Sequence, residues 1–488
     1  MTAVLPRTPP ATGTAPALSA TGIAVLLLGA FLPIVDFFIV NVALPTIDGD
    51  LHASAPSLEL IVAGYGTAYA ALLVVGGRLG DALGRRRVFT AGLVGFTVTS
   101  LLCGIAPSIG SLVTFRIAQG ATAALIVPQV LATFQAALDG ARRAKALGLY
   151  GATAGIASVV GQVAGGLIVT ADIAGAGWRP IFLVNVPIGV LALVATYRYV
   201  PATKSDHPAG IDLPGTVLFA ATLVALLVPL TEGRTVGWPL WTWLVLGVAV
   251  VLGAVTWRVE RRTERGGHVP LLPPTLLAVR SMRRGLVLGL PFFLSFGGFM
   301  FVFALTVQDG LHADALHGGL AIAPFALTFL AGSLLTPRAI ARFGRAALAG
   351  GSLVAAAGYG TVAITVARDW PHVPLLALTP GLAIAGFGQA FVFGSLFRLV
   401  LAEVPAHLAG VGGGVLVTLQ QSGLALGVAT LGTLYLSIGA GGDGFATILA
   451  VQSAIAVIMA VGSRAMPSLA SAPRTGAPAT PAALPVEA

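Results

Sequence analysis

Residues 76–90 read GGRLGDALGRRRVFT and lie between two long apolar stretches. The segment holds one acid, Asp81, together with four arginines and four glycines. A segment this short and this charged is unfavourable in hydrocarbon, whereas the apolar stretches on either side can cross it. The arrangement therefore predicts a short cytoplasmic or external loop that joins two membrane-spanning helices.

Composition supports a membrane location for the whole chain. Of the 488 residues, 56% are hydrophobic and only 9% are charged, and the mean hydropathy is +0.94. A water-soluble domain of this size would not have this composition. The net charge of +9 raises the question of a nucleic-acid partner, but the basic residues form short clusters between apolar runs. Such clusters indicate membrane topology, and no nucleic acid is expected.

Apolar runs of about 20 residues, long enough to cross ~30 Å of hydrocarbon, occur fourteen times. We expect all-α spans at approximately 22–45, 57–78, 88–106, 111–137, 146–170, 180–200, 212–231, 239–257, 285–307, 318–337, 346–367, 374–397, 409–438 and 445–463. The tails, residues 1–20 and 466–488, are rich in Pro, Ala and Thr or Ser and are expected to be disordered.

The distribution of basic residues predicts the orientation. With the N-terminus in the cytoplasm, 23 of the 27 lysines and arginines fall on the cytoplasmic side. Only Arg179, Arg234 and Arg368 fall outside, and Arg116 lies within a span. This bias obeys the positive-inside rule and places both termini in the cytoplasm.

Two segments of the chain repeat at nearly the same spacing. Arg78 and Arg85 match Arg338 and Arg345 at an offset of 260, and the fifth and thirteenth spans match at an offset of 259. Internal repeats of this kind are common in transporter folds. We expect a six-helix bundle at 21–204, two extra helices and a cytoplasmic linker at 205–284, and a second six-helix bundle at 285–465.

The opening segment resembles the loop signature of the major facilitator superfamily, with Ala82 in place of a consensus arginine. The matching residues are Gly77, Leu79, Asp81, Gly84, Arg85 and Arg86. The fourteen spans resemble the drug:proton antiporter branch of that superfamily. So do DFFIVNVALPTI from Asp36, RIAQGATAA from Arg116 and WRPIFLVNVPIG from Trp178.

This resemblance implies a bacterial plasma-membrane protein, expected to be a monomer, that exports small hydrophobic compounds such as drugs or antibiotics in exchange for protons. One motif departs from the branch. The fifth-helix signature G-P-x-x-G-G is GQVAGG here, with Gln162 in place of proline. The motif residues are Gly155, Gly161, Gln162, Gly165 and Gly166; its glycines, together with Gly151, are considered for close helix packing or a sliding interface.

Only two ionisable residues fall well inside the predicted spans, Asp36 in the first and Arg116 in the fourth. A charge in hydrocarbon costs at least ~2.5–3.5 kcal/mol, so such residues usually face a cavity or each other. At 1.5 Å per residue they lie ~13 Å and ~8 Å below the outer ends of their helices, close enough in depth to pair. Asp36 is the candidate proton carrier and Arg116 its electrostatic switch; the alternative is a static buried ion pair.

Two further sets of residues are candidates for the mechanism. The loop residues Gly77, Arg78, Asp81, Gly84, Arg85 and Arg86 would latch one conformation, or would only set the topology. The intramembrane amides would line a substrate cavity or would only bond across helices, and they are Gln119, Gln389, Gln420 and Gln421.

Other activities are less favoured by the sequence. The segment from Asp309 to His317 holds two aspartates and two histidines without a sign that they converge, so no metal is expected. Lys145 and Lys204 follow no phosphate-binding loop, which argues against ATP hydrolysis, and no cofactor is expected. A proton-independent facilitator or importer is the main alternative. A channel or a membrane-embedded enzyme comes next, and neither a charged ring nor a nucleophile motif supports one.

Overall fold

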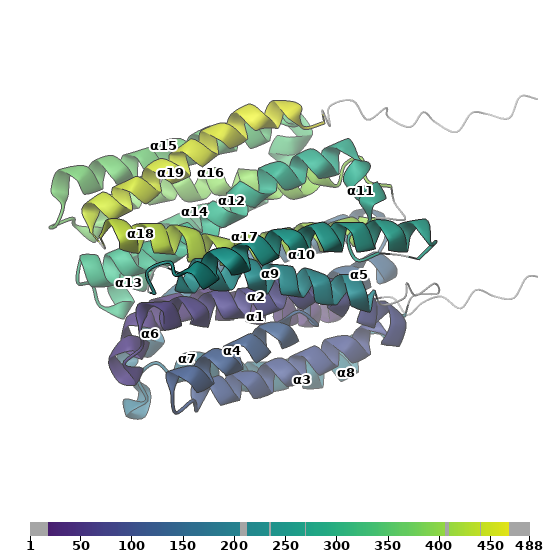
Figure 1. Cartoon of the computed structure of the whole chain (residues 1–488), viewed down its shortest axis with the longest axis horizontal. Helices are drawn as coiled ribbons and strands as arrows, with labels where there is room; N and C mark the ends of the chain where they lie inside the picture. The colour runs from purple at the N-terminus through teal and green to yellow at the C-terminus, as the bar shows by residue number, and fades with distance from the viewer. Residues whose placement is uncertain are drawn as a thin grey trace, which may run out of the picture.

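The computed structural model describes residues 18–204, 212–233, 236–268, 270–405, 409–439 and 441–467, and within these ranges it contains helices and no strand. The long helices run side by side along one direction (Figure 1). Helices satisfy their own backbone hydrogen bonds, which hydrocarbon cannot do for them. The first helix begins directly after Ser19, whose Oγ accepts the Gly22 amide at 3.0 Å.

The first bundle contains eight helical segments, because two of its six spans are interrupted. The fourth span breaks after Ala123 and resumes at Val127, where Pro128 starts a new helix without needing an N–H partner. The sixth span breaks just before Asn185. The segments are α1 (Ala20–Leu51), α2 (Ala55–Leu83), α3 (Arg85–Gly104), α4 (Ile109–Ala123), α5 (Val127–Ala137), α6 (Gly140–Ala171), α7 (Pro180–Leu183) and α8 (Asn185–Tyr199).

The two extra helices follow, and the linker after them carries a short third one. These are α9 (Leu213–Glu232), α10 (Leu240–Arg265) and α11 (Pro274–Ala278). Helix α9 packs on α2 of the first bundle and on α17 of the second, so it covers one side of the boundary between them. The Thr433 hydroxyl, just beyond α17, donates to the Leu230 carbonyl at 3.3 Å.

The second bundle also contains interrupted spans. Its segments are α12 (Arg280–Leu305), α13 (Ala315–Ala321), α14 (Ala323–Phe343), α15 (Ala346–Asp369), α16 (Leu375–Val400), α17 (Ala409–Gly427), α18 (Thr433–Ile438) and α19 (Gly442–Gly462). Single π-helical turns at 306–310 and 428–432 extend α12 and join α17 to α18.

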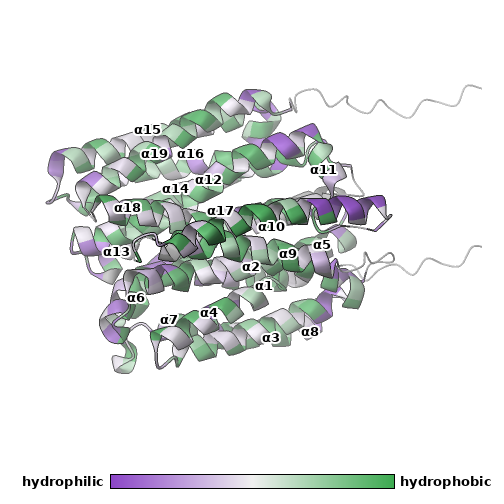
Figure 2. Cartoon of the chain, viewed as in Figure 1, coloured by the Kyte–Doolittle hydropathy of each residue, from purple (hydrophilic) through white to green (hydrophobic). Residues whose placement is uncertain are grey.

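The number of spans agrees with the sequence prediction. Thirteen helices of the described residues are long and apolar enough to cross a membrane, and a shorter apolar helix, Pro214–Leu230, makes the fourteenth. Large apolar side chains of α10, among them Val250 and Trp243, are exposed and suit contact with lipid. Figure 2 shows hydrophobic residues along the helices and hydrophilic ones at ends such as the last turns of α10. The all-α fold of two bundles and two extra helices is confirmed.

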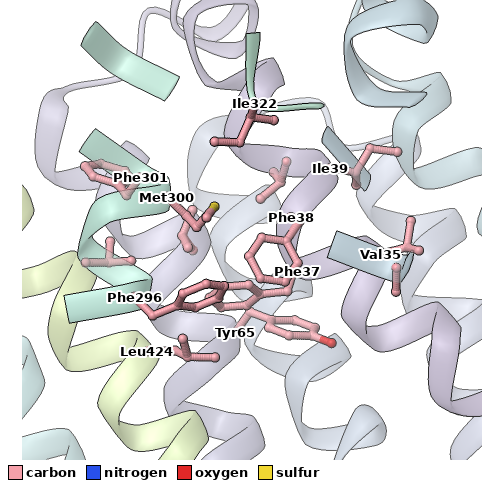
Figure 3. Packing of buried hydrophobic residues seen from close by; sticks show 14 of the residues in the cluster. Val35, Phe37, Phe38, Ile39, Tyr65, Phe296, Met300, Phe301, Ile322 and Leu424 are labelled. Carbon is pink, nitrogen blue, oxygen red and sulfur yellow. The ribbon is translucent and has the colours of Figure 1, made fainter. Parts of the chain in front are cut away.

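The two bundles meet along several pairs of helices, among them α1 with α12, α2 with α17, and α6 with α13 and α14. Between α1 and α12, the rings of Phe38 and Phe296 pack edge to face with centroids 6.3 Å apart (Figure 3). Helix α2 approaches α17 at Gly66, and α6 approaches α13 at Gly319, where an added Cβ would lie 2.6 Å from the Gln162 carbonyl oxygen. Small residues allow these close approaches.

Glycines also allow close packing inside the second bundle, between α12 and α17. A Cβ at Gly427 would lie 2.0 Å from the Leu294 carbonyl oxygen, and one at Gly298 would lie 2.8 Å from the Gly427 carbonyl oxygen. Gly413 and Gly414 of α17 make no such close approach, since a Cβ at either would meet nothing within 4 Å.

Substituting Gly427 with alanine is therefore expected to destabilise the protein by about 1–3 kcal/mol, because the added methyl group must push the backbones of α12 and α17 apart. Gly414→Ala, on the same helix but facing open space, is the matched control and should be close to neutral. Thermal unfolding of both variants in detergent tests this. Equal melting temperatures would show that the α12–α17 contact does not need glycine.

Candidate functional site

The two intramembrane charges identified in the sequence form a direct contact. Asp36 on α1 and Arg116 on α4 both have side chains with no exposure to solvent, and Arg116 Nη1 donates to Asp36 Oδ2. Arg116 also donates through Nε to the Ile61 carbonyl at 3.1 Å and through Nη1 to Gln119 Oε1 at 2.7 Å. The pairing expected from their similar depths is therefore present in the structure.

The second oxygen of the Asp36 carboxylate has two further donors. Gln119 Nε2 donates to Asp36 Oδ1 at 2.9 Å, and Asn185 Nδ2 donates to the same oxygen at 2.8 Å. Gln119 Nε2 also bonds to Ser100 Oγ at 2.8 Å. A buried carboxylate with donors on both oxygens is well stabilised when ionised, which compensates for its removal from water.

Sequence reasoning missed the role of Asn185. The residue starts α8, directly after the break in the sixth span. Two signals were available: Asn185 lies in the quoted WRPIFLVNVPIG stretch, and it is one of only two asparagines in the chain. A polar amide in an apolar run usually has a partner across helices.

Sorting ionisable residues by predicted span also missed a buried acid. Glu59, placed at the edge of the second span, has a relative exposure of 2% near the start of α2. Helix α2 begins at Ala55, so Glu59 lies one turn inside the helix rather than at its edge.

A layer of aromatic side chains in mutual contact links the Asp36–Arg116 pair to the second bundle. The Arg116 guanidinium lies 4.3 Å from the Tyr65 ring centroid, within range of a cation–π contact. The Tyr65 ring packs on Phe37, and its hydroxyl donates to the Pro33 carbonyl at 3.0 Å. Figure 3 shows Tyr65, Phe37 and Phe38 grouped beside Phe296.

The glycines of the fifth-span motif pack α6 against the part of α1 that carries Asp36. A Cβ at Gly161 would lie 2.8 Å from the Val35 carbonyl oxygen, and one at Gly165 would lie 2.9 Å from the Ile39 carbonyl oxygen. Gly155 instead faces the Phe329 ring of α14, and Gly166 is buried on the same helix as the others. Gln162, which replaces the consensus proline, leaves α6 continuous and is itself buried.

The charged loop is held by contacts within the first bundle. Asp81 at the end of α2 and Arg85 at the start of α3 form an ion pair at 3.0 Å across the turn at Gly84. The Arg85 amide donates to the Thr203 carbonyl at 2.9 Å, and Arg86 Nη1 donates to the Val200 carbonyl at 3.3 Å. These contacts tie the turn between α2 and α3 to the chain just after α8.

The glycines of this loop have different roles. Gly84 has φ of 100°, a conformation that side chains other than glycine rarely adopt. Gly77 has room for a methyl group, whereas a Cβ at Gly80 would collide with the Gln129 side chain. Gly80, which lies between the matched positions of the signature, is thus under a tighter packing constraint than Gly77.

Arg78, at the same loop, reaches outside the first bundle. Its Nη2 donates to the carbonyl of Pro270 in the linker. In the second bundle Arg345, the repeat position of Arg85, makes a similar contact, in which Nη1 donates to the carbonyls of Arg464 and Met466 at 2.8 and 3.2 Å. Gly344, like Gly84, has a positive φ.

The four glutamines proposed for a substrate cavity are not brought together. Gln119 belongs to the Asp36 network. Gln389 lies in the second bundle, where its Nε2 donates to the Tyr359 hydroxyl at 2.7 Å, and it lines a small cavity with Phe292 and Gln452. Gln420 is half-buried and Gln421 is buried on α17. Their role in substrate binding stays a prediction.

The acidic and histidine-rich segment at 309–317 forms a helix cap. Asp314 accepts the His317 amide at 2.7 Å and begins α13. The His317 ring nitrogen lies 2.8 Å from Asp314, and these contacts hold the pKa of that carboxyl below its ordinary value. Among the described residues, no group of three or more His, Cys, Asp or Glu side chains could hold a metal ion.

The two facing bundles, the buried charge network and the glycine contacts between helices define a polytopic membrane transport protein. The chain belongs to the Major Facilitator Superfamily, whose family model matches residues 26–428. The resemblance inferred from the sequence motifs is confirmed.

Relatives with curated descriptions cover most of the chain. A probable actinorhodin transporter of Streptomyces coelicolor is 37% identical over 417 residues, which cover 85% of this chain and 72% of that protein. The puromycin resistance protein pur8 of Streptomyces alboniger is 36% identical, and the match covers 85% of this chain and 81% of that protein. A cephamycin export protein of Amycolatopsis lactamdurans is 33% identical, and the match covers 90% of this chain and 91% of that protein.

Solved structures of other transporters share the fold. A POT family transporter in complex with 5-aminolevulinic acid superposes with a TM-score of 0.68 at 14% identity, covering 92% of this chain and 98% of that one. A D-xylose-proton symporter superposes with a TM-score of 0.62 at 16% identity, covering 91% and 96%. At these identities the likeness shows the fold alone.

Removing the arginine of the buried pair should be costly. Arg116→Ala is expected to destabilise the protein by about 3–5 kcal/mol, since it leaves the buried Asp36 carboxylate without its counter-charge. Arg179→Ala removes a partly exposed ion pair with Asp50 at 2.8 Å and should cost about 1 kcal/mol or less. Unfolding in detergent measures both, and similar losses would contradict a special role for burial.

Proposed function

We propose that the protein exports small hydrophobic compounds across the bacterial plasma membrane in exchange for protons. The observation that carries this proposal is the Asp36 carboxylate, fully buried against Arg116, Gln119 and Asn185 at the junction of α1, α4 and α8. An acid at this depth is costly to keep unless it has a function or a structural partner that requires it.

The surroundings of Asp36 suit reversible protonation. Donors on both oxygens favour the ionised form, and burial in a low-dielectric environment opposes it. Moving α4 or α8 away from α1 would remove donors and shift this balance toward the protonated acid. In the conformation that brings Arg116 back to Asp36, the guanidinium would compete with the proton for the carboxylate. The site would therefore take up a proton in one conformation and release it in the other.

The aromatic layer connects this site to the proposed substrate path. Phe38 of α1 follows Asp36 by two residues and touches Phe296 of the second bundle. Movement of α1 during protonation would therefore displace Phe38 and change its contact with Phe296 at the boundary between the bundles. All buried charged side chains among the described residues lie in the first 260 residues, so the second bundle would offer the substrate an apolar and aromatic surface.

The direction of transport is supported by the relatives. Their descriptions name antibiotic transport, resistance and export. Together with the apolar boundary between the bundles, they favour efflux of hydrophobic drugs or antibiotics. We further propose that a single copy of the chain is the working unit, and the distribution of basic residues supports both termini in the cytoplasm.

Alternating access would occur by rocking of the two bundles about the Asp36 level. The bundle at 21–204 and the bundle at 285–465 would move against each other, with 205–284 connecting them. The loop around Asp81 would act as a latch, because its ion pair and its contacts with the chain after α8 join α2, α3 and α8 at the cytoplasmic end.

A proton-independent facilitator or an importer is the alternative function. It would use the same two bundles, with the Asp36–Arg116 contact as a fixed pair that only joins α1 to α4. A channel and a membrane-embedded enzyme receive no support from the described site. The two main candidates differ in whether substrate movement is accompanied by proton movement.

Replacing the acid with its amide separates these functions. Asp36→Asn keeps the shape and can still accept hydrogen bonds, but it cannot exchange a proton. In inverted vesicles with an imposed pH gradient, uptake of a fluorescent hydrophobic dye should fall to the level of vesicles without the protein.

The matched control is Asp50→Asn at the outer end of the same helix, where the carboxylate bonds to Trp178 and Arg179. This variant should retain gradient-driven uptake. If Asp36→Asn also retained it, with proton movement intact, the proton-carrier role would be wrong.

The latch is tested by removing the Asp81 carboxylate. Asp81→Ala should slow turnover several-fold and leave the substrate affinity nearly unchanged, because the ion pair lies far from the bundle boundary. Asp139→Ala breaks an ion pair of the same spacing and distance, Asp139 with Arg143 at 3.0 Å in another loop, and should alter neither value. A change confined to affinity in Asp81→Ala would contradict the latch.

A further inference from the structure

A second pair of acidic side chains is buried at the cytoplasmic end of the extra helices. Asp212 immediately precedes α9 and Glu260 lies in the last turns of α10, with relative exposures of 8% and 1%. Neither residue belongs to the Asp36 network or to the family motifs identified in the sequence. Buried acids are rare unless they are paired or protonated.

The two carboxylates approach each other at Gly215. A Cβ built on that glycine would lie 2.3 Å from Glu260 Oε1 and 2.4 Å from Asp212 Oδ2. The two oxygens are therefore no more than about 5 Å apart, a distance at which two like charges disfavour each other's ionisation.

The hydrogen bonds of the pair are unequal. Asp212 accepts the Gly215 amide on Oδ1 at 2.9 Å and the Leu271 amide on Oδ2 at 3.1 Å. Glu260 accepts the Leu272 amide on Oε2 at 3.0 Å, whereas its buried Oε1 has no hydrogen-bond partner among the described residues. Asp212 also sits at the positive N-terminal end of α9, which favours its ionised form.

The charges around the pair do not balance. The charged groups that act on Glu260 from neighbouring elements are Asp212 beside α9 and Arg78 on α2, and the linker contributes only its amides. Arg78 is in turn influenced by Asp212, Glu260 and Asp81. Among the described residues, one cation thus faces two buried anions, and a single proton would neutralise this group.

We propose that Glu260 and Asp212 form a second proton-binding site, in which a proton on Glu260 Oε1 is donated to Asp212 Oδ2. The proton gives Glu260 Oε1 the hydrogen bond that it lacks and leaves one negative charge opposite Arg78. The site is separate from Asp36, so it does not depend on the export function proposed above.

The position of this pair gives the proton a structural consequence. Asp212, Glu260 and Arg78 hold three successive linker residues, through the amides of Leu271 and Leu272 and the carbonyl of Pro270. The linker joins the extra helices to the second bundle. Loss of the proton would set two anions against each other and loosen the linker from α2, α9 and α10.

Infrared difference spectroscopy of the full chain in detergent tests the proton directly. Between mildly acidic and alkaline buffer, the wild type should lose the absorption of one protonated carboxyl group. The band should be absent from Glu260→Gln. It should also be absent from Asp212→Asn, in which Glu260 keeps Arg78 and loses its like-charged neighbour.

Two controls locate the band. Glu264 lies one turn further along α10, and its carboxylate also holds the linker, by accepting hydrogen bonds from the amide and hydroxyl of Thr275. None of these bonds involves another acid, so Glu264→Gln should keep the band. Asp36→Asn should keep it as well. If both pair variants retained the full band, or if Asp36→Asn alone abolished it, the second site would be refuted.

Hydrogen exchange measures the effect on the linker. After correction for the intrinsic pH dependence of exchange, the amides of Leu271 and Leu272 should exchange faster in alkaline than in acidic buffer. Glu260→Gln should remove this difference while Glu264→Gln keeps it. Equal exchange at both pH values in the wild type would contradict the link between the proton and the linker.

Discussion

Burying a carboxylate in the apolar interior of a helical bundle requires that its donors come from the surrounding helices, because water and lipid cannot supply them. Asp36 meets this requirement with Arg116 and Gln119 from α4 and Asn185 from α8. The contact fixes the positions of three helices relative to one another. Helix α6 can then approach α1 only because Gly161 and Gly165 face its backbone.

The two bundles differ in chemistry although they share a fold. Buried charge is confined to the first bundle and the extra helices among the described residues. The second bundle instead places Phe293, Phe296, Phe329 and Phe393 in a chain of ring contacts. An apolar bundle that moves against a charged one would combine a surface for hydrophobic compounds with a site for protons.

The ends of the bundles that carry the loop after α2 and its repeat after α14 use the same kind of contact twice. Arginines that follow the positive-φ residues Gly84 and Gly344 bond to carbonyls just after the last long helix of each bundle. The first bundle adds Arg78, which reaches the linker together with Asp212 and Glu260. The extra helices are therefore joined to the loop between α2 and α3 by charged side chains, and α9 also packs directly on α2.

The sequence by itself determined the membrane location, the fourteen spans and the family, because span length, hydropathy and loop motifs are local properties of the chain. It also identified Asp36 and Arg116, since a charge stands out in an apolar run. Only the tertiary structure revealed Asn185 as a partner, Glu59 as a buried group, and Glu260 and Asp212 as neighbours. Those assignments depend on which helix faces come together, and residues far apart in the chain acquire a common environment only when the helices pack.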